Sequence, residues 1–407
     1  MAEGERVLPR PYKSTVDIVA ARRARLAVNV VFVIHGILFA SWTAHVPQVK
    51  AALNIGDGQL GIALLGESVG SVTATLLAGV ILARFGSRSV VRVGAIGYCL
   101  AGILVGLSGS IAELFAALAV WGLFAGGLDV AMNTQAINVE RELGRPIMGK
   151  MHGSWSIGSL VGSGIGVAAV ALGVTLTWQL LALGVVTVII ALVLIGRMLD
   201  DPVHEHHHHH TARRRRRPSA TLVILGTIAF AGLLTEGGTG NWSAVYMRDT
   251  LHAQPAVAGL AYTAFTLMMV TVRLLGARLL RRYSPRQVIS VCAAIATVGI
   301  GTALVIGNPV AGIIGFGLFG VGLASIIPMV FSAAGNQPDM AAGTAVATVS
   351  AVGWIGFMVG PPLIGLVAGH SSLSIALIVF PLLTGFVALA APRIRALDLA
   401  KPTEISE

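Results

Sequence analysis

Long apolar stretches, separated by short polar segments, occupy almost the whole chain. Each approaches the roughly 20 residues that a helix needs to cross a bilayer. The pattern predicts about twelve spans, at residues 26–46, 59–83, 90–108, 111–138, 151–172, 176–198, 220–245, 257–280, 288–306, 310–333, 342–368 and 373–391. The expected fold class is therefore an all-α integral membrane protein.

One polar segment interrupts this pattern near the middle of the chain. Residues 201–218 read DPVHEHHHHHTARRRRRP, with five consecutive histidines and five consecutive arginines. A block of like charge stays in water, so this segment is expected to link two membrane-embedded halves. The expected division is a tail at 1–21, a six-helix bundle at 22–199, a linker at 200–219, a second six-helix bundle at 220–392 and a tail at 393–407.

The two halves resemble each other at a constant offset of 198 residues. The positions that recur are 79–88 with 277–286, Gly158 and Gly162 with Gly356 and Gly360, and Gly61 with Gly259. Chance matches among the 50 glycines are the alternative. Because basic residues recur together with the glycines, the sequence predicts two six-helix pseudo-repeats.

Composition excludes a water-soluble globule. Hydrophobic residues make up 55% of the chain and charged residues only 11%, which leaves too little polar surface. A formal net charge of +10 would fit a nucleic-acid partner in a soluble protein. Here the basic residues lie at predicted helix ends, as in membrane proteins. We expect the lipid bilayer as a partner, and no nucleic acid.

The same basic residues predict the orientation of the chain. If the N-terminus is cytoplasmic, only Lys50 and Arg248 fall on the outside. On the inside, besides the arginine run, are Arg84, Arg88, Arg92, Arg141, Arg145, Lys150, Arg281, Arg282, Arg286, Arg393 and Arg395. This asymmetry predicts that both termini are cytoplasmic.

One short motif matches an enzyme signature. His204, Glu205 and His208 spell HExxH, which binds zinc when both histidines lie on one turn of a rigid helix. Here the match lies in a histidine run after a proline, where a rigid helix is not expected. We therefore expect no enzymatic activity, no cofactor and no metal site.

Several motifs together resemble a known family. Residues 79–88 carry a Gly-x4-Arg-x-Gly-x-Arg turn between the second and third helices, which includes Arg84 and Arg88. With six plus six helices and a polar central segment, the chain resembles the major facilitator superfamily. The stretches 127–158 and 236–249 resemble an uncharacterised bacterial branch near the fucose-permease-like members. The resemblance implies a secondary transporter of the bacterial inner membrane, in which two halves rock about a central site.

One departure from the family pattern affects gating. The family usually carries an aspartate at the position of Ala83, so the gating salt bridge of that aspartate is missing here, and Arg84 and Arg88 remain gating candidates. Asp129 and Arg273 lie in opposite halves, about 13 Å and 12 Å from the cytoplasmic ends of their predicted helices. We expect them to pair when the inner side closes. The alternative is that each is satisfied within its own half.

Four side chains within predicted spans are candidates for proton coupling: Glu236, Asp129, Glu67 and His35. An ionisable group in a span costs about 2.5 to 3.5 kcal/mol, so each needs a partner, water or a task. Glu236 is the first choice, because glycines 237, 238 and 240 predict an interrupted helix beside it. A structural brace is the alternative for Glu236, and a neutral, hydrogen-bonded packing histidine is the alternative for His35.

Polar residues near these groups are candidates for cargo binding. They are Asn133, Gln135, His152, Trp155, Asn241 and Trp242. Asn133 follows Asp129 by one helical turn, so the two share a face. Hydrogen bonding between helices is the alternative for the polar residues. For Trp42 and Trp242, which lie near helix ends, anchoring at the membrane interface is the commoner role.

The expected function is proton-coupled transport of a small polar organic solute, such as a sugar or a related metabolite, by alternating access. The expected partners are this solute, protons and lipid, and the chain is expected to be a monomer. Efflux of drugs or metabolites is the second possibility, and a non-transporting receptor or scaffold is the third. Glycines spaced by three or four residues, such as Gly158, Gly162 and Gly166, predict close helix contacts or bending points.

Overall fold

The computed structural model describes residues 18–145, 147–200, 219–337, 340 and 342–400 of the 407-residue chain. The His/Arg-rich run, residues 1–17 of the predicted N-terminal tail and residues 401–407 of the predicted C-terminal tail lie outside the described residues. Within them, twelve helices are long and apolar enough to cross a membrane. The predicted fold class is thus confirmed.

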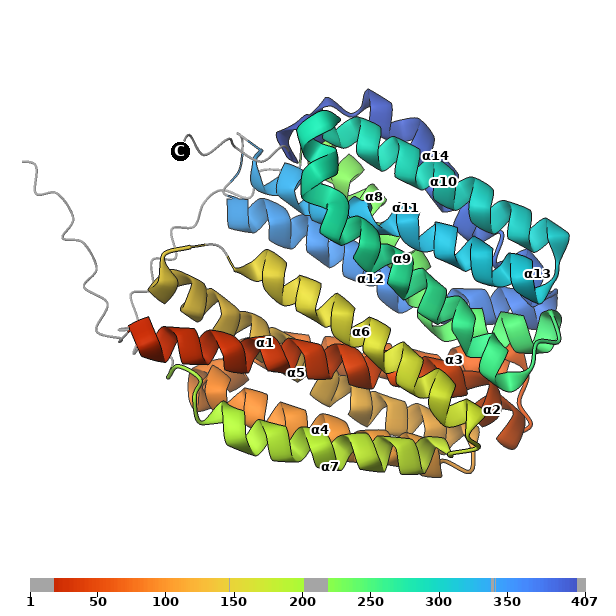
Figure 1. Cartoon of the computed structure of the whole chain (residues 1–407), viewed down its shortest axis with the longest axis horizontal. Helices are drawn as coiled ribbons and strands as arrows, with labels where there is room; N and C mark the ends of the chain where they lie inside the picture. The colour runs from red at the N-terminus through yellow and green to blue at the C-terminus, as the bar shows by residue number, and fades with distance from the viewer. Residues whose placement is uncertain (1–17, 146, 201–218, 338–339, 341, 401–407) are drawn as a thin grey trace, which may run out of the picture.

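The first half contains six spans (Figure 1). The first span is built from α1 (Ile18–Trp42) and two short continuations, η1 (Thr43–His45) and α2 (Val46–Ala52). The other five are α3 (Asp57–Phe85), α4 (Ser87–Leu107), α5 (Ile111–Leu143), α6 (Met148–Ala171) and α7 (Leu176–Ile195).

The second half repeats this arrangement. Its elements are α8 (Ala220–Val245), η2 (Tyr246–Thr250), α9 (Pro255–Arg282), α10 (Pro285–Ile306), α11 (Pro309–Gly335), α12 (Ala342–His370), α13 (Leu373–Ala376), α14 (Val379–Ala390), η3 (Ala391–Arg393) and η4 (Arg395–Ala400). The twelfth span is divided between α13 and α14. Pro381, which has no backbone N–H to donate, is the third residue of α14.

Local sequence signals fix where many helices begin. Ser110, Ser284, Asn308 and Ser372 each accept a hydrogen bond from the backbone N–H three residues further on. Such caps satisfy N–H groups that the first turn of a helix leaves without a partner. The first helix begins at Ile18, eight residues before the predicted start at 26, because hydropathy does not mark a helix that continues beyond the hydrocarbon.

The pseudo-repeat is visible in the helix boundaries. Helices α9, α10 and α11 begin at Pro255, Pro285 and Pro309, each 198 residues after the start of α3, α4 and α5. In Figure 1 the helices of the first half, drawn red to yellow-green, lie together below those of the second half. The offset predicted from the sequence is therefore the offset between equivalent helices.

The recurring glycines make equivalent contacts in the two halves. A methyl group added to Gly158 of α6 would lie 2.2 Å from the carbonyl oxygen of Val33 in α1. One added to Gly356 of α12 would lie 2.3 Å from the carbonyl oxygen of Phe230 in α8. Both helix pairs thus pack backbone against backbone, which only glycine permits at such a distance. The predicted close helix contacts are confirmed.

The tryptophans show that one expectation was wrong. Trp42 and Trp242 are only 1% and 0% exposed, so neither anchors at a lipid interface. Trp42 packs edge to face with Trp121, and Trp242 donates its indole N–H to the carbonyl oxygen of Pro361. Sequence position near a helix end did not reveal that these two rings face the protein interior.

Candidate functional site

The two halves meet along two equivalent helix pairs, α3 with α12 and α6 with α9. Gly61 of α3 packs against Gly365 of α12, where an added methyl group would lie 2.9 Å from the Gly365 Cα. At the positions related by the 198-residue offset, Gly259 of α9 packs against Val167 of α6. The interface therefore follows the pseudo-symmetry of the chain.

One end of this interface is held together by charge. The Lys50 ammonium lies 2.5 Å from a carboxylate oxygen of Asp57 and 2.5 Å from one of Asp249. Asp57 begins α3 in the same half, whereas Asp249 lies in η2 of the other half. Figure 1 shows α2, α3 and α9 converging here. We call this the Lys50 end, and the opposite end, with Arg88 and Arg281, the arginine end.

Some positions on the interface helices lie against no other part of the chain. Met358 of α12 accepts a hydrogen bond from the Ser68 hydroxyl of α3 through its carbonyl oxygen. Trp354, four residues earlier in α12, is 49% exposed. A methyl group added to Gly79 of α3, or to Gly276 of α9, would meet no atom within 4 Å. The closed state of the Lys50 end rests on the ion pair between Lys50 and Asp249, which joins the two halves.

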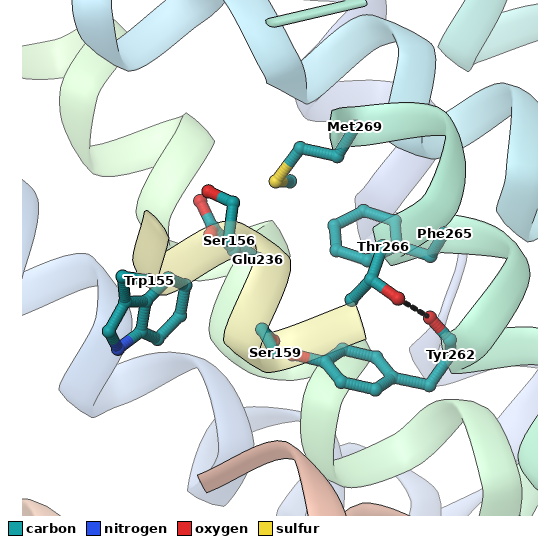
Figure 2. A pocket seen from close by; sticks show the side chains of 8 residues that line it. All are labelled: Trp155, Ser156, Ser159, Glu236, Tyr262, Phe265, Thr266 and Met269. Atoms are coloured by element: carbon teal, nitrogen blue, oxygen red, sulfur yellow. Dashed lines mark hydrogen bonds between the residues drawn. The ribbon is translucent and has the colours of Figure 1, made fainter. Parts of the chain in front are cut away.

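A pocket lies between these two ends, where α6, α8 and α9 meet (Figure 2). Its volume of about 10 Å³ is close to the smallest that holds one water molecule. In Figure 2 the α6 residues face those of α9 across the pocket. The lining residues are Trp155, Ser156 and Ser159 of α6, Glu236 of α8, and Tyr262, Phe265, Thr266 and Met269 of α9.

Glu236 supplies the carboxylate of this pocket. The helix that carries it is not interrupted, because α8 runs from Ala220 to Val245 through all three glycines. The predicted break is therefore wrong. Gly237 and Gly238 instead allow Phe357, Ile364 and Phe380 to pack directly against α8, so that small size rather than backbone freedom explains them.

Arg273 connects the pocket to the first half. Its guanidinium donates to the Ser156 hydroxyl at 2.6 Å and to the carbonyl oxygen of Ala324. It also interacts electrostatically with Glu236 and with His152. A positive charge thus lies beside the pocket and holds α9 against α6.

The predicted partner of Arg273 is engaged elsewhere in this conformation. Asp129 accepts a hydrogen bond from the Asn133 side chain at 3.2 Å, one helical turn further along α5. The shared face predicted for Asp129 and Asn133 is confirmed. Pairing of Asp129 with Arg273 was predicted for the state in which the arginine end is closed, so it stays a prediction.

Glu67 of α3 faces the same region from the first half. It interacts electrostatically with Tyr98 of α4 and with Tyr262 of α9, and Glu236 also interacts with Tyr262. Two carboxylates from opposite halves therefore lie within electrostatic reach of one tyrosine. Sequence spacing gave no sign of this, because the two residues are far apart in the chain and on different helices.

His35 lies behind the pocket, with both ring nitrogens engaged. Its Nδ1 lies 2.9 Å from the indole nitrogen of Trp155, and its Nε2 lies 3.3 Å from the carbonyl oxygen of Ala125. The ring stacks on Tyr98 with centroids 5.3 Å apart. This geometry favours the alternative of a neutral, hydrogen-bonded histidine over that of a proton carrier.

The other predicted site residues lie away from the pocket. Gln135 donates to the Ser87 hydroxyl and to the carbonyl oxygen of Leu199, and Asn241 donates to the carbonyl oxygen of Gly237. Trp242 packs against α12. These contacts are the helix-to-helix or local bonding that was the alternative to cargo binding.

The two arginines of the family turn make contacts within their own half. Arg88 donates to a carboxylate oxygen of Asp200 at 2.8 Å and to the carbonyl oxygen of Gly196. The Arg84 guanidinium lies over the Phe85 ring, 5.4 Å from its centroid. Arg88 thereby connects the start of α4 to the segment after α7.

Sequence reasoning missed all of the hydroxyl groups that line the pocket. Ser156, Ser159 and Ser163 follow one another at spacings of three and four, as do Tyr262, Thr266, Met269 and Arg273. Such spacing places each set on one helix face. Ser163 and Thr266 meet across the interface, with their hydroxyl oxygens 3.3 Å apart. Polar stripes on two apolar helices were therefore the signal that could have found the site.

Comparisons with known proteins agree with this architecture. A sequence profile of the Major Facilitator Superfamily matches residues 28–236 and 224–406. An uncharacterized MFS-type transporter of Yersinia pestis is 35% identical over 355 residues, which are 86% of this chain and 91% of the relative. Membrane protein MosC of Rhizobium meliloti is 31% identical over 358 residues, 86% of this chain and 85% of MosC.

Solved structures show the same fold at low sequence identity. A D-xylose-proton symporter superimposes with a TM-score of 0.69 and 14% identity, covering 93% of this chain and all of the symporter. The nucleoside transporter NupG superimposes with a TM-score of 0.65 and 14% identity, covering 92% of this chain and 98% of NupG. Twelve spans in two six-helix repeats, the matching profile and these relatives lead to one conclusion. The chain belongs to the major facilitator superfamily and is an MFS-type transporter of the membrane, not an enzyme.

Proposed function

We propose that this transporter moves a small, sugar-like polar solute together with protons through the pocket of Figure 2. The observation that carries the proposal is the position of Glu236: a carboxylate lies in an interfacial pocket lined by aromatic rings and hydroxyl groups from both halves. A group placed between the halves can contact cargo in every conformation of the cycle.

The lining has the chemistry that a sugar requires. Trp155 and Tyr262 offer ring faces against which the C–H groups of a pyranose or furanose can pack, while Ser156, Ser159 and Thr266 offer hydroxyl groups. The similar structures include a D-xylose-proton symporter and a nucleoside transporter, and both of those cargoes contain a sugar ring. The likeness shows the fold alone, so the cargo class rests on the pocket.

The cavity of this conformation is too small for such a solute. At about 10 Å³ it admits one water molecule and no sugar. Cargo entry therefore requires α6 and α9 to separate, which breaks the contacts of Ser156 with Arg273 and of Ser163 with Thr266. Because these two contacts cross between the halves, cargo binding and the relative position of the halves would be coupled.

Glu236 is the proposed proton carrier, with Glu67 as the second candidate. A carboxylate inside a membrane protein is costly unless it is paired, hydrated or protonated. Arg273 attracts Glu236 electrostatically, while its guanidinium donates hydrogen bonds to Ser156 and to the carbonyl oxygen of Ala324. A carboxylate with this partial compensation can exchange a proton as the pocket opens to water.

We also propose that the transporter is a monomer in the inner membrane with both termini cytoplasmic. We further propose that it lies near the fucose-permease-like members and that its two bundles span residues 22–199 and 220–392. Pairing of Asp129 with Arg273 is the proposed closure of the arginine end. Arg84 and Arg88 are proposed to support that closure from the turn between α3 and α4.

Drug or metabolite efflux is the second candidate. Phe265 and Met269 line the pocket beside Glu236, and apolar rings with one carboxylate also suit an amphiphilic cation. The two candidates differ in the class of solute that the pocket should bind.

A solute panel distinguishes the candidates. We expect an aldopentose, an aldohexose or a nucleoside to raise the melting temperature of the purified protein, since a ligand that binds only the folded state stabilises it. The panel should include two cationic amphiphilic drugs, and hits should be repeated with Glu236→Gln and Tyr262→Ala. Stabilisation by the drugs alone would replace the proposed cargo with the second candidate.

A further inference from the structure

We propose that His35 is a positioning residue: a permanently neutral hydrogen-bond acceptor that fixes the indole ring of Trp155 against the pocket. The inference deepens the proposed function, because it assigns the residue that sets the orientation of a cargo-contacting ring. It rests on the proposed function only in that Trp155 contacts cargo. The state of His35 itself follows from geometry.

The hydrogen bonds determine which ring nitrogen carries the proton. An indole N–H can only donate, so the Nδ1 atom that faces Trp155 at 2.9 Å must offer a lone pair. The Nε2 atom faces the carbonyl oxygen of Ala125 at 3.3 Å, and a carbonyl oxygen can only accept. Nε2 therefore carries the hydrogen. A second proton on Nδ1 would point directly at the indole hydrogen and break the bond.

The helices around His35 leave it little freedom to turn. A methyl group added to the neighbouring Gly36 would lie 2.3 Å from the carbonyl oxygen of Trp155, so α1 and α6 touch through their backbones at this level. On its other side the His35 ring stacks on Tyr98, which stacks in turn on Trp121 with centroids 5.0 Å apart. The backbone contact of α1 with α6 and a column of rings thus hold the imidazole in place.

Among the residues that the structure describes, the groups in direct contact with His35 are uncharged. The elements packed against it contribute Tyr98 from α4, the Ala125 carbonyl from α5 and Trp155 from α6. Glu67 of α3 lies within electrostatic reach of Tyr98. Within the described residues, the hydrogen bonds and ring contacts of His35 are thus all with uncharged groups.

The indole of Trp155, held by His35, forms part of the wall of the pocket. Trp155 lines the cavity opposite Tyr262 and is followed directly by Ser156, which holds Arg273 (Figure 2). The Phe39 ring packs against the Trp155 indole from a second side, with the two ring centroids 5.9 Å apart. Loss of the His35 acceptor would let the indole tilt, which would change the width of the site between α6 and α9.

The indole N–H signals of the six tryptophans test this directly. With nitrogen-15-labelled protein in nanodiscs, Trp155→Phe identifies the Trp155 signal. We expect this signal to stay constant from pH 8 to pH 5 and to move to lower proton frequency in His35→Phe. His35→Gln, whose amide oxygen can accept, should restore it. The Trp242 indole, which donates to Pro361 at 3.0 Å, is the internal control and should not move.

Transport kinetics provide a second test of the role of His35. For the sugar that stabilises the parent protein most, His35→Phe should raise the KM about tenfold, equivalent to about 1.4 kcal/mol. His35→Phe should leave kcat within about twofold of the parent value. Adding His35→Phe to Trp155→Phe should not raise the KM further, because both variants remove the same hydrogen bond.

Either of two results would overturn the inference. One is a Trp155 signal that titrates between pH 8 and pH 5, which would make His35 a proton carrier. The other is an unchanged Trp155 signal in a folded His35→Phe variant, with KM effects that simply add. If no sugar binds while the indole signals behave as expected, the proposed cargo fails and the role of His35 stands.

Discussion

Replacing Glu236 by glutamine is expected to abolish accumulation of the cargo against its gradient while preserving exchange of labelled for unlabelled cargo. Glutamine keeps the size of the side chain and can still form hydrogen bonds, but it cannot release or bind a proton. Exchange needs only loading and reorientation of the loaded carrier. Accumulation also needs a proton to travel with the cargo, and Glu236 is the carboxylate that lines the pocket.

Two variants define the controls for this experiment. Glu113→Gln changes an exposed carboxylate at the start of α5 and should behave as the parent does. Glu67→Gln tests the second candidate, which lies within electrostatic reach of Tyr262. Normal accumulation by Glu236→Gln would contradict the assignment of Glu236. Loss of accumulation in Glu67→Gln alone would assign proton coupling to Glu67 of α3.

Replacing Gly61 by leucine is expected to prevent closure of the Lys50 end and to abolish transport, with the protein still folded. Even a methyl group at this position would lie 2.9 Å from the Gly365 Cα and 3.4 Å from the carbonyl oxygen of Pro362. Both neighbours are backbone atoms, which cannot rotate away. If overpacking costs about 3 kcal/mol, the closed state becomes roughly 150-fold less populated. The halves can relieve the clash by separating, so folding of each half is spared.

Spin-label distances across the Lys50 end measure this effect. Labels at the exposed positions Ala52 and Gln254 report the separation of the halves, after Cys99 and Cys292 have been replaced by alanine. The distance should lengthen in Gly61→Leu. It should not change in Gly164→Leu, since a methyl group added to Gly164 meets no atom within 4 Å. Parent-like transport by Gly61→Leu would show that the α3–α12 contact does not need to form.

The sequence was sufficient for most of the fold. Membrane-length apolar runs predicted every span, because hydrocarbon thickness sets the length of a helix whatever it packs against. The 198-residue offset also held, as the starts of α3 and α9 at Asp57 and Pro255 show. What hydropathy could not give was the extent of α1 in the polar region before residue 26, where water no longer requires apolar side chains.

The candidate site was predicted only in part. Glu236 and Trp155 do line the pocket, because ionisable and aromatic residues in spans are rare enough to be noticed. Tyr262 was missed, since its importance comes from two carboxylates on other helices. The glycines 237, 238 and 240 were misread because glycine serves both bends and close packing. Only the neighbouring Phe357 and Ile364 show which role applies.

The central claim, proton-coupled transport of a sugar-like solute through the Glu236 pocket, is tested most directly by solute-driven pH change. Purified protein in proteoliposomes, with a pH-sensitive dye inside and no imposed gradient, should show a pH change when the best-binding sugar is added outside. The sign of the change gives the direction of coupling, and a protonophore should abolish it. Cargo uptake with no pH change in the parent protein, at a rate that Glu236→Gln shares, would contradict the account and indicate facilitated diffusion or another coupling ion.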